Sequence, residues 1–122
     1  MQIINLTPHP INFFAPEDAP NGTVLPDAEP CRTIPPSLPP ARVSCTWTPT
    51  GEIDGVPLYQ PTYGQVQGLP DPAPGVAYIV SLLTAQAAAA SGRTTSDLYA
   101  VAQTVRDASG RIVGCLGLSQ PV

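Results

Sequence analysis

The sequence contains no lysine, and charged residues of any kind make up only 11% of its 122 positions. Five arginines stand against nine acidic residues, which gives a formal net charge of −4 at pH 7. Duplex nucleic-acid binding depends on neutralising phosphates, so an acidic chain without a basic run argues against that class of partner. Low charge also weakens repulsion between copies, which favours self-association.

Groups able to perform catalysis are scarce. The chain has one histidine, His9, and a nucleophile needs an adjacent base. The acidic residues are spread through loop segments where solvation accounts for them, and neither a Rossmann nor a P-loop glycine pattern occurs. The sequence therefore predicts a protein that is not an enzyme and that carries no cofactor.

Cysteines are few and show no metal-ligand spacing. Cys31, Cys45 and Cys115 make an odd set without a CxxC pair, so we expect reduced, structural thiols and no metal site. The N-terminal residues lack the basic region and the cleavage site of a signal peptide. The most apolar window, residues 75–90, is shorter than the ~20 residues of a membrane span. These features predict a soluble, cytoplasmic protein with no membrane partner.

Proline is abundant instead. Seventeen prolines occur, and sixteen of them precede residue 75. Because proline fixes φ and removes a backbone donor, this region must consist of short strands, turns and extended loops. The one uninterrupted stretch able to form a helix is residues 81–91, with Ser81 as its N-cap and Gly92 as the residue that ends it. This stretch is nearly all apolar, which predicts a helix buried on most sides and points to a homo-oligomer.

Alternation of apolar and polar residues and turn signals predict the strands. Residues 41–48 alternate most clearly and place Trp47 on an apolar face in the core. A turn is expected at residues 49–51, and Asp54–Gly55 is a hairpin signal. The other predicted strands are residues 2–6, 11–15, 56–62 and 76–80, with a hairpin over residues 105–118 that turns at 107–110. The predicted fold is α+β: a single domain over residues 1–122, with a small, bent, mostly antiparallel sheet, one buried helix near residues 81–91 and long proline-rich loops.

Candidate ligand-binding residues follow from elimination. Without lysine, only arginine, backbone amides and one histidine can oppose an anion. Arg106 and Arg111 flank the last turn, where two guanidinium groups could bind a phosphate or a carboxylate; the alternative is a pair of solvated charges. Arg42 lies on the polar face of its strand and is a further candidate.

Three other residues could contribute to such a site. His9 lies on a rigid turn between two prolines, although its ring could equally serve to lock that turn. Tyr63 could offer a flat face to a nucleobase, and a core aromatic is the alternative. Ser81 begins the predicted helix, where exposed amides and the positive end of the dipole attract anions, but an ordinary cap explains it as well.

Several segments read in order resemble a family of small uncharacterised proteins found in bacteriophages and bacterial genomes. The similar segments span nearly the whole chain: residues 5–9 (NLTPH), 34–37, 41–43, 55–59, 63–70 (YGQVQGLP), 75–81 (including YIVS), 85–87, and 105–113 (beginning VRD and ending GRIV). Gln65 and Gln67 depart from the family pattern, which commonly has acids there. The resemblance implies a phage or bacterial setting and leaves the activity open.

Three functions are compatible with these features. The first is a non-enzymatic small-ligand-binding protein that sequesters an anionic nucleotide immune signal, and thus an anti-defence protein that works as a sponge. The second is an accessory protein-interaction or virion structural protein that uses its proline-rich loops. The third is a small hydrolase.

Overall fold

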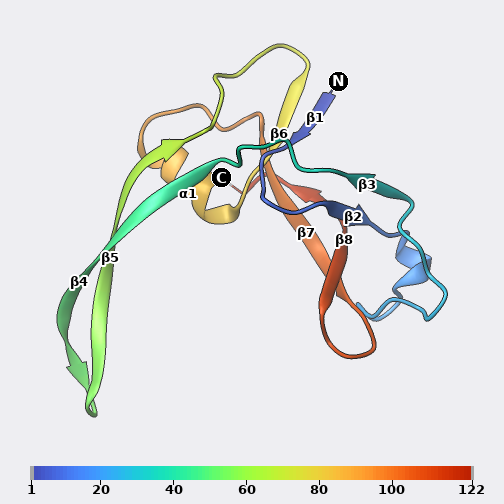
Figure 1. Cartoon of the computed structure of the whole chain (residues 1–122), viewed down its shortest axis with the longest axis horizontal. Helices are drawn as coiled ribbons and strands as arrows, with labels where there is room; N and C mark the ends of the chain where they lie inside the picture. Colours follow the sequence, from blue (N-terminus) through green and yellow to red (C-terminus); the bar gives the residue numbers. More distant parts are fainter. Residues whose placement is uncertain (1, 122) are drawn as a thin grey trace.

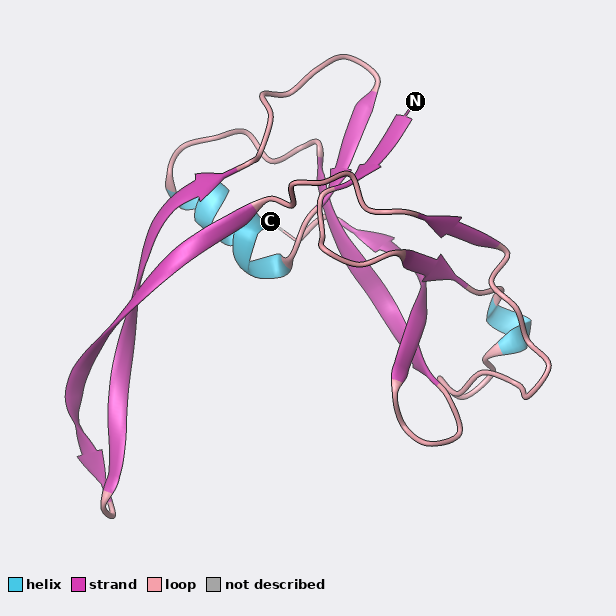
Figure 2. Ribbon diagram, viewed as in Figure 1, coloured by secondary structure: helices cyan, strands magenta, loops and turns pink. Residues whose placement is uncertain are grey.

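The structure is a computed structural model that describes residues 2–121, and it consists mostly of strands with one α-helix (Figures 1 and 2). This agrees with the predicted α+β class. The elements in chain order are β1 (Gln2–Asn5), β2 (Ile11–Phe13), the 3-10 helix η1 (Pro16–Asp18), β3 (Arg32–Ile34), β4 (Arg42–Ile53), β5 (Val56–Gln67), β6 (Val76–Ile79), α1 (Leu82–Ala90), β7 (Leu98–Arg106) and β8 (Ile112–Ser119).

Six strands form one sheet in the order β1-β6-β7-β8-β2-β3. The pairs β1–β6, β6–β7 and β2–β8 are parallel, whereas β7–β8 and β2–β3 are antiparallel. The six-stranded sheet is therefore mixed, and the predicted mostly antiparallel arrangement describes only part of it. Parallel neighbours need long connections, and the proline-rich segments and α1 provide them. Strand β3 lies in a segment for which the sequence predicted only loop.

The helix α1 connects β6 to β7 as the crossover of a βαβ unit. Ser81 caps its start by accepting a hydrogen bond from the amide of Thr84 at 3.1 Å. At the other end Gly92 takes a φ of +89° and its amide reaches the Ala89 carbonyl, while the next amide, of Arg93, reaches Ala88. These are the two bonds of a Schellman motif, so both predicted helix signals are confirmed.

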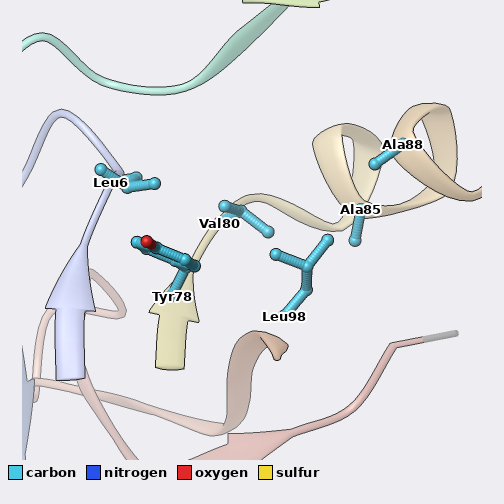
Figure 3. Packing of buried hydrophobic residues seen from close by; sticks show 6 residues of the cluster. All are labelled: Leu6, Tyr78, Val80, Ala85, Ala88 and Leu98. Atoms are coloured by element: carbon cyan, nitrogen blue, oxygen red, sulfur yellow. The ribbon is translucent and has the colours of Figure 1, made fainter. Parts of the chain in front are cut away.

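One face of α1 packs on the sheet (Figure 3). Ala85 and Ala88 join a buried cluster with Leu6, Tyr78, Val80 and Leu98. The opposite flank remains in water: Leu82 is 53% exposed and Leu83 38%. A helix buried on most sides was thus a wrong prediction for the single chain, because one sheet face covers only one side of a helix.

A second part of the core lies where β8 runs between β7 and β2. Cys115 is buried there with Ile11, Ile34 and Ile79. The strand is central, as its two apolar faces predicted. Close approach of β2 makes glycine necessary at position 114, since an added Cβ would lie 2.5 Å from the Asn12 carbonyl oxygen and 2.7 Å from the Phe14 ring.

Asn5 is the polar centre of the fold and is only 1% exposed. Its amide nitrogen donates to the carbonyls of His9 at 2.8 Å and Ile34 at 3.1 Å, while its oxygen accepts from the amide and hydroxyl of Thr7 at 2.9 and 2.6 Å. A single side chain therefore holds the turn after β1 and fastens it to β3.

Strands β4 and β5 form a separate two-stranded ribbon that extends away from the rest of the molecule (Figure 1). We call this ribbon, residues 42–67, the arm. Its turn is at Asp54 and Gly55, both with positive φ, as predicted. The turn expected at residues 49–51 is wrong, because these residues stay in β4 and form an irregularity in its register.

Trp47 was expected in the core but is 61% exposed. The alternation that predicted an apolar face is real, since Trp47 pairs with Pro61 on the arm. The arm reaches beyond α1, so no part of the described chain covers this face. Among residues 2–121, no helix is long and apolar enough to cross a lipid bilayer.

Candidate functional site

A groove runs along α1 beneath the base of the arm. One end is a hollow of about 210 Å³ lined by Thr7, Pro8, Ala41, Arg42, Val43, Ser81, Leu83 and Thr84. The adjoining hollow, of about 380 Å³, is lined by Tyr63, Gly64, Leu83, Gln86, Ala87, Ala90 and Ser91. Leu83 lines both hollows, so we treat them as one base groove with a polar end and an apolar end.

Arg42 stands at the polar end of the base groove. It is the first residue of β4, and its side chain is exposed. Within residues 2–121 its guanidinium group makes no hydrogen bond and no ion pair. Arg93, by contrast, is occupied by Asp97 at 2.9 and 3.0 Å and by two carbonyls. Arg42 therefore keeps its donors free for a partner outside the chain.

The start of α1 faces the same end of the base groove. The Ser81 hydroxyl is already used, since it accepts from the Thr84 amide and donates to the Thr84 hydroxyl at 2.8 Å. What this end can offer an anion is the positive end of the helix dipole and the first backbone amides of the helix, which have no partner within it. Ser81 thus acts as a cap of α1.

Tyr63 lines the apolar end of the base groove. It lies opposite Cys45 in the arm, and its side chain is 46% exposed. The alternative of a core aromatic does not describe it. It lines the same hollow as Leu83, Ala87 and Ala90 of α1, so an aromatic side chain and an apolar helix flank border one space.

Arg106 and Arg111 lie at the β7–β8 turn, apart from the hollows described above. Arg106 donates to the Gly110 carbonyl at 2.8 Å. The pKa of Asp107 lies below its ordinary value of 3.8, first because the Ser109 hydroxyl donates to it at 2.7 Å and then because the Arg111 amide donates to it at 3.0 Å. Arg106 is therefore engaged within the turn through its side chain, whereas Arg111 contributes its backbone amide and its guanidinium group makes no hydrogen bond within residues 2–121.

His9 lines a different hollow, of about 370 Å³, on the face formed by β2, β7 and β8. Its other lining residues include Thr7, Thr104, Ile112 and Cys115, and they contain no arginine. The backbone carbonyl of His9, rather than its ring, takes part in locking the turn, through Asn5. Burial raises the pKa of the Cys115 thiol, which keeps it protonated and poorly nucleophilic.

Arg42 and Ser81 thus line one hollow and Tyr63 lines the next, with Leu83 common to both. His9 lines a third hollow, which shares Thr7 with the first, and Arg106 and Arg111 line none of the three. Sequence reasoning missed Leu83, Ala87 and Ala90, which form the floor of the base groove. Their i, i+4 and i+7 spacing places them on one flank of the helix, but that signal was hidden because almost every residue of the helix is apolar.

Comparison of the chain with protein-family models, with curated proteins and with solved structures finds no significant match. The resemblance to a phage and bacterial family stays a prediction from the sequence. The functional argument accordingly depends on the geometry of this chain alone.

Proposed function

We propose that the protein is a non-enzymatic binding protein that takes a small anionic ligand of the nucleotide class in the base groove. The observation that carries this proposal is the free guanidinium group of Arg42 at the mouth of a hollow that the start of α1 also lines. Guanidinium donors and helix N-terminal amides are the groups that bind phosphate. Tyr63, at the other end of the groove, supplies a surface on which a base can stack.

The dimensions of the base groove support a nucleotide over a bare anion. The polar end, about 210 Å³, suits a phosphate group, and the apolar end, about 380 Å³, suits a base. Ligand pockets for small molecules commonly fall between about 300 and 1,000 Å³. In a phage-infected bacterial cytoplasm, such a protein would work as a sponge for a nucleotide immune signal; the sequence resemblance supports the phage or bacterial setting and leaves the activity open.

The chemistry around His9 supports binding over hydrolysis. A cysteine nucleophile would need a lowered pKa, whereas burial raises that of Cys115, the thiol in the same hollow. A protein-interaction role is the second candidate, and one observation favours it: the exposed aromatic residues of the arm, among them Trp47 and Tyr59.

Calorimetry with adenosine monophosphate and with adenosine tests the ligand proposal. We expect the phosphorylated compound to bind more tightly, because only its phosphate can meet Arg42. Arg42→Ala should remove most of this difference, since a hydrogen bond to a charged group contributes about 1.5–3 kcal/mol. Arg111→Ala makes the same charge change away from the groove and serves as the control.

Each outcome of this experiment has a clear meaning. Loss of binding in Arg111→Ala but not in Arg42→Ala would move the site to the β7–β8 turn that the sequence favoured. Equal affinity for the two compounds in the wild-type protein, or no binding of either at millimolar concentration, would refute the proposal. Native mass spectrometry of protein purified from host lysate then identifies a nucleotide that co-purifies with it.

A further inference from the structure

The arm exposes an apolar face along much of its length. The register of β4 and β5 places Trp47 opposite Pro61 and Pro49 opposite Tyr59. Because side chains directly opposite each other share a face, Trp47, Tyr59 and Tyr63 lie on the same side of the ribbon. We call these three residues, with the prolines between them, the aromatic face.

The other side of the same ribbon is polar. It carries Ser44, Thr46 and Thr48 on β4, with Thr62 opposite Thr46 and Gln60 opposite Thr48. The arm is therefore amphipathic in the way of a strand pair that packs on something through one face. Yet Trp47 is 61% exposed and Tyr59 55%, so the described chain leaves this face uncovered.

A free arm of this kind lacks support from its own molecule. Its strands have 12 residues each and make no ladder with the six-stranded sheet. An isolated two-stranded hairpin is at best marginally stable in water, and a third layer or more strands are needed to hold it. The base of the arm contacts α1, and the rest of the ribbon extends beyond the helix (Figure 2).

We infer that the aromatic face packs against the aromatic face of a second copy of this chain, two arms lying face to face about a twofold axis. In a twofold arrangement the same surface of each chain forms one half of the interface, so the aromatic face of one copy packs against the aromatic face of the other. The two ribbons would form a small sandwich with the polar faces outward, and sheets packed in this way lie about 10 Å apart.

Charge argues for a copy of the chain over a different partner. The three aromatic residues and the prolines between them carry no charge, and the nearest charged residue in the register is Glu52, opposite Pro57 beyond the shift after Pro49. Helix α1 is also uncharged, and its Leu83, Ala87 and Ala90 line the same hollow as Tyr63. Two copies can therefore approach through the aromatic face without like-charge repulsion despite a net charge of −4. A strongly charged partner would find no counter-charge on this face.

The exposed area of the aromatic face supplies part of a dimer contact. At the 150–250 Å² that an aromatic side chain can bury, the exposed parts of the three rings amount to about 240–400 Å². A standard interface buries roughly 800 Å² per partner, so the prolines of the arm and the flank of α1 would have to supply the remaining area. Contiguous apolar patches of this size mark interaction sites on soluble proteins.

The tests use substitutions of one residue on each face of β4. Trp47→Glu puts a charge on the aromatic face, and Thr48→Glu puts the same charge on the polar face next to it. Light scattering across a concentration series should give a dimer for the wild type and for Thr48→Glu. Trp47→Glu should raise the dimer dissociation constant about 30-fold or more, the effect of removing an aromatic hot spot.

The unmodified protein gives a second readout, because Trp47 is its only tryptophan. Its fluorescence emission should shift to longer wavelength on dilution, over the same concentrations at which the scattering mass falls to that of one chain. A monomer at all micromolar concentrations would overturn the inference and leave the face to another partner. So would an oligomer that keeps its mass in Trp47→Glu, or one that Thr48→Glu dissociates equally.

This inference and the proposed ligand fail separately. Trp47→Glu changes the mass, whereas Arg42→Ala lies on the opposite face of the arm and changes the affinity for adenosine monophosphate. Because Tyr63 and the α1 flank line the base groove and also belong to the proposed dimer surface, nucleotide binding is measured both in the wild type and in Trp47→Glu. Binding by neither protein would refute only the ligand proposal, and a wild-type monomer that binds the nucleotide would refute only the dimer.

Discussion

Replacing Asn5 with alanine should destabilise the protein more than any other change to a polar side chain discussed above. Asn5 is 1% exposed and takes part in four hydrogen bonds, two as donor and two as acceptor. Each such bond contributes about 0.5–1.5 kcal/mol net, and partners left buried and unsatisfied cost more. We therefore expect Asn5→Ala to lower the free energy of unfolding by about 3 kcal/mol, because the Ile34 carbonyl and the Thr7 amide lose their partner in the interior.

Thermal and urea unfolding followed by circular dichroism measure this loss. For a domain of this size, about 3 kcal/mol corresponds to a fall of roughly 10–15 °C in Tm. Asn12→Ala is the matched control, since the same side chain is only half-buried and bonds to the Val113 carbonyl at 3.2 Å and the Thr33 hydroxyl at 2.8 Å. It should cost about 1 kcal/mol.

Asn5→Asp separates hydrogen bonding from packing, because it keeps the shape of the side chain. The substitution removes the two N–H donors and points a carboxylate at the carbonyls of His9 and Ile34. Burial raises the pKa of such a carboxyl, so its penalty should be largest at neutral pH and shrink as the pH falls and the group is protonated. If Asn5→Ala cost no more than Asn12→Ala, or if Asn5→Asp had no penalty at pH 7, the reasoning would be refuted.

Three further predictions concern other elements. Gly114→Ala should cost about 1–3 kcal/mol by overpacking against β2, whereas Gly117→Ala, with no atom within 4 Å of its added Cβ, should be nearly neutral; equal urea midpoints would contradict this. Asp107 has a lowered pKa, so its contribution to stability is present above pH 3.8 and is lost as the pH falls through the folded-state pKa. Asp107→Asn should therefore reduce the dependence of the unfolding free energy on pH in this range. An unchanged dependence would argue against the hydrogen bonds of the turn. A thiol reagent should modify exposed Cys31 in the native protein and reach buried Cys115 only after unfolding, as peptide mass mapping would show; early labelling of Cys115 would mean that β8 opens readily.

Local sequence signals predicted most of the helix and strand positions. They did not predict features that depend on contacts between distant parts of the chain. The helix boundaries followed from Ser81 and Gly92, because caps act within one turn of the chain. The directions of the strands did not, since pairing β2 with β8 depends on contacts between residues far apart in sequence. Alternation correctly predicted that Trp47 lies on an apolar face of its strand. It shows which residues share a face, but it does not show whether another part of the chain covers that face.

The candidate site divides in the same way. The sequence identified Arg42, Tyr63 and Ser81 as candidates because of their side-chain chemistry. Their positions in the sequence do not show that the base of the arm lies on α1, where these residues line two neighbouring hollows. Arg106 and Arg111 looked equally suitable in the sequence. Only the hydrogen bonds of their turn show that Arg106 is engaged with Gly110.

The residues that hold this fold and the residues that face outward belong to different parts of the chain. Asn5 and Gly114 act inside the six-stranded sheet, which neither strand of the arm joins. Ordering the arm costs conformational entropy, and placing the indole of Trp47 in water recovers none of it. An element that loses conformational entropy on folding and leaves its apolar face in water is stabilised when another molecule covers that face. The proposed contact with a second copy would therefore stabilise the arm more than the six-stranded sheet, and at the base of the arm that contact and the proposed anion would lie closest together.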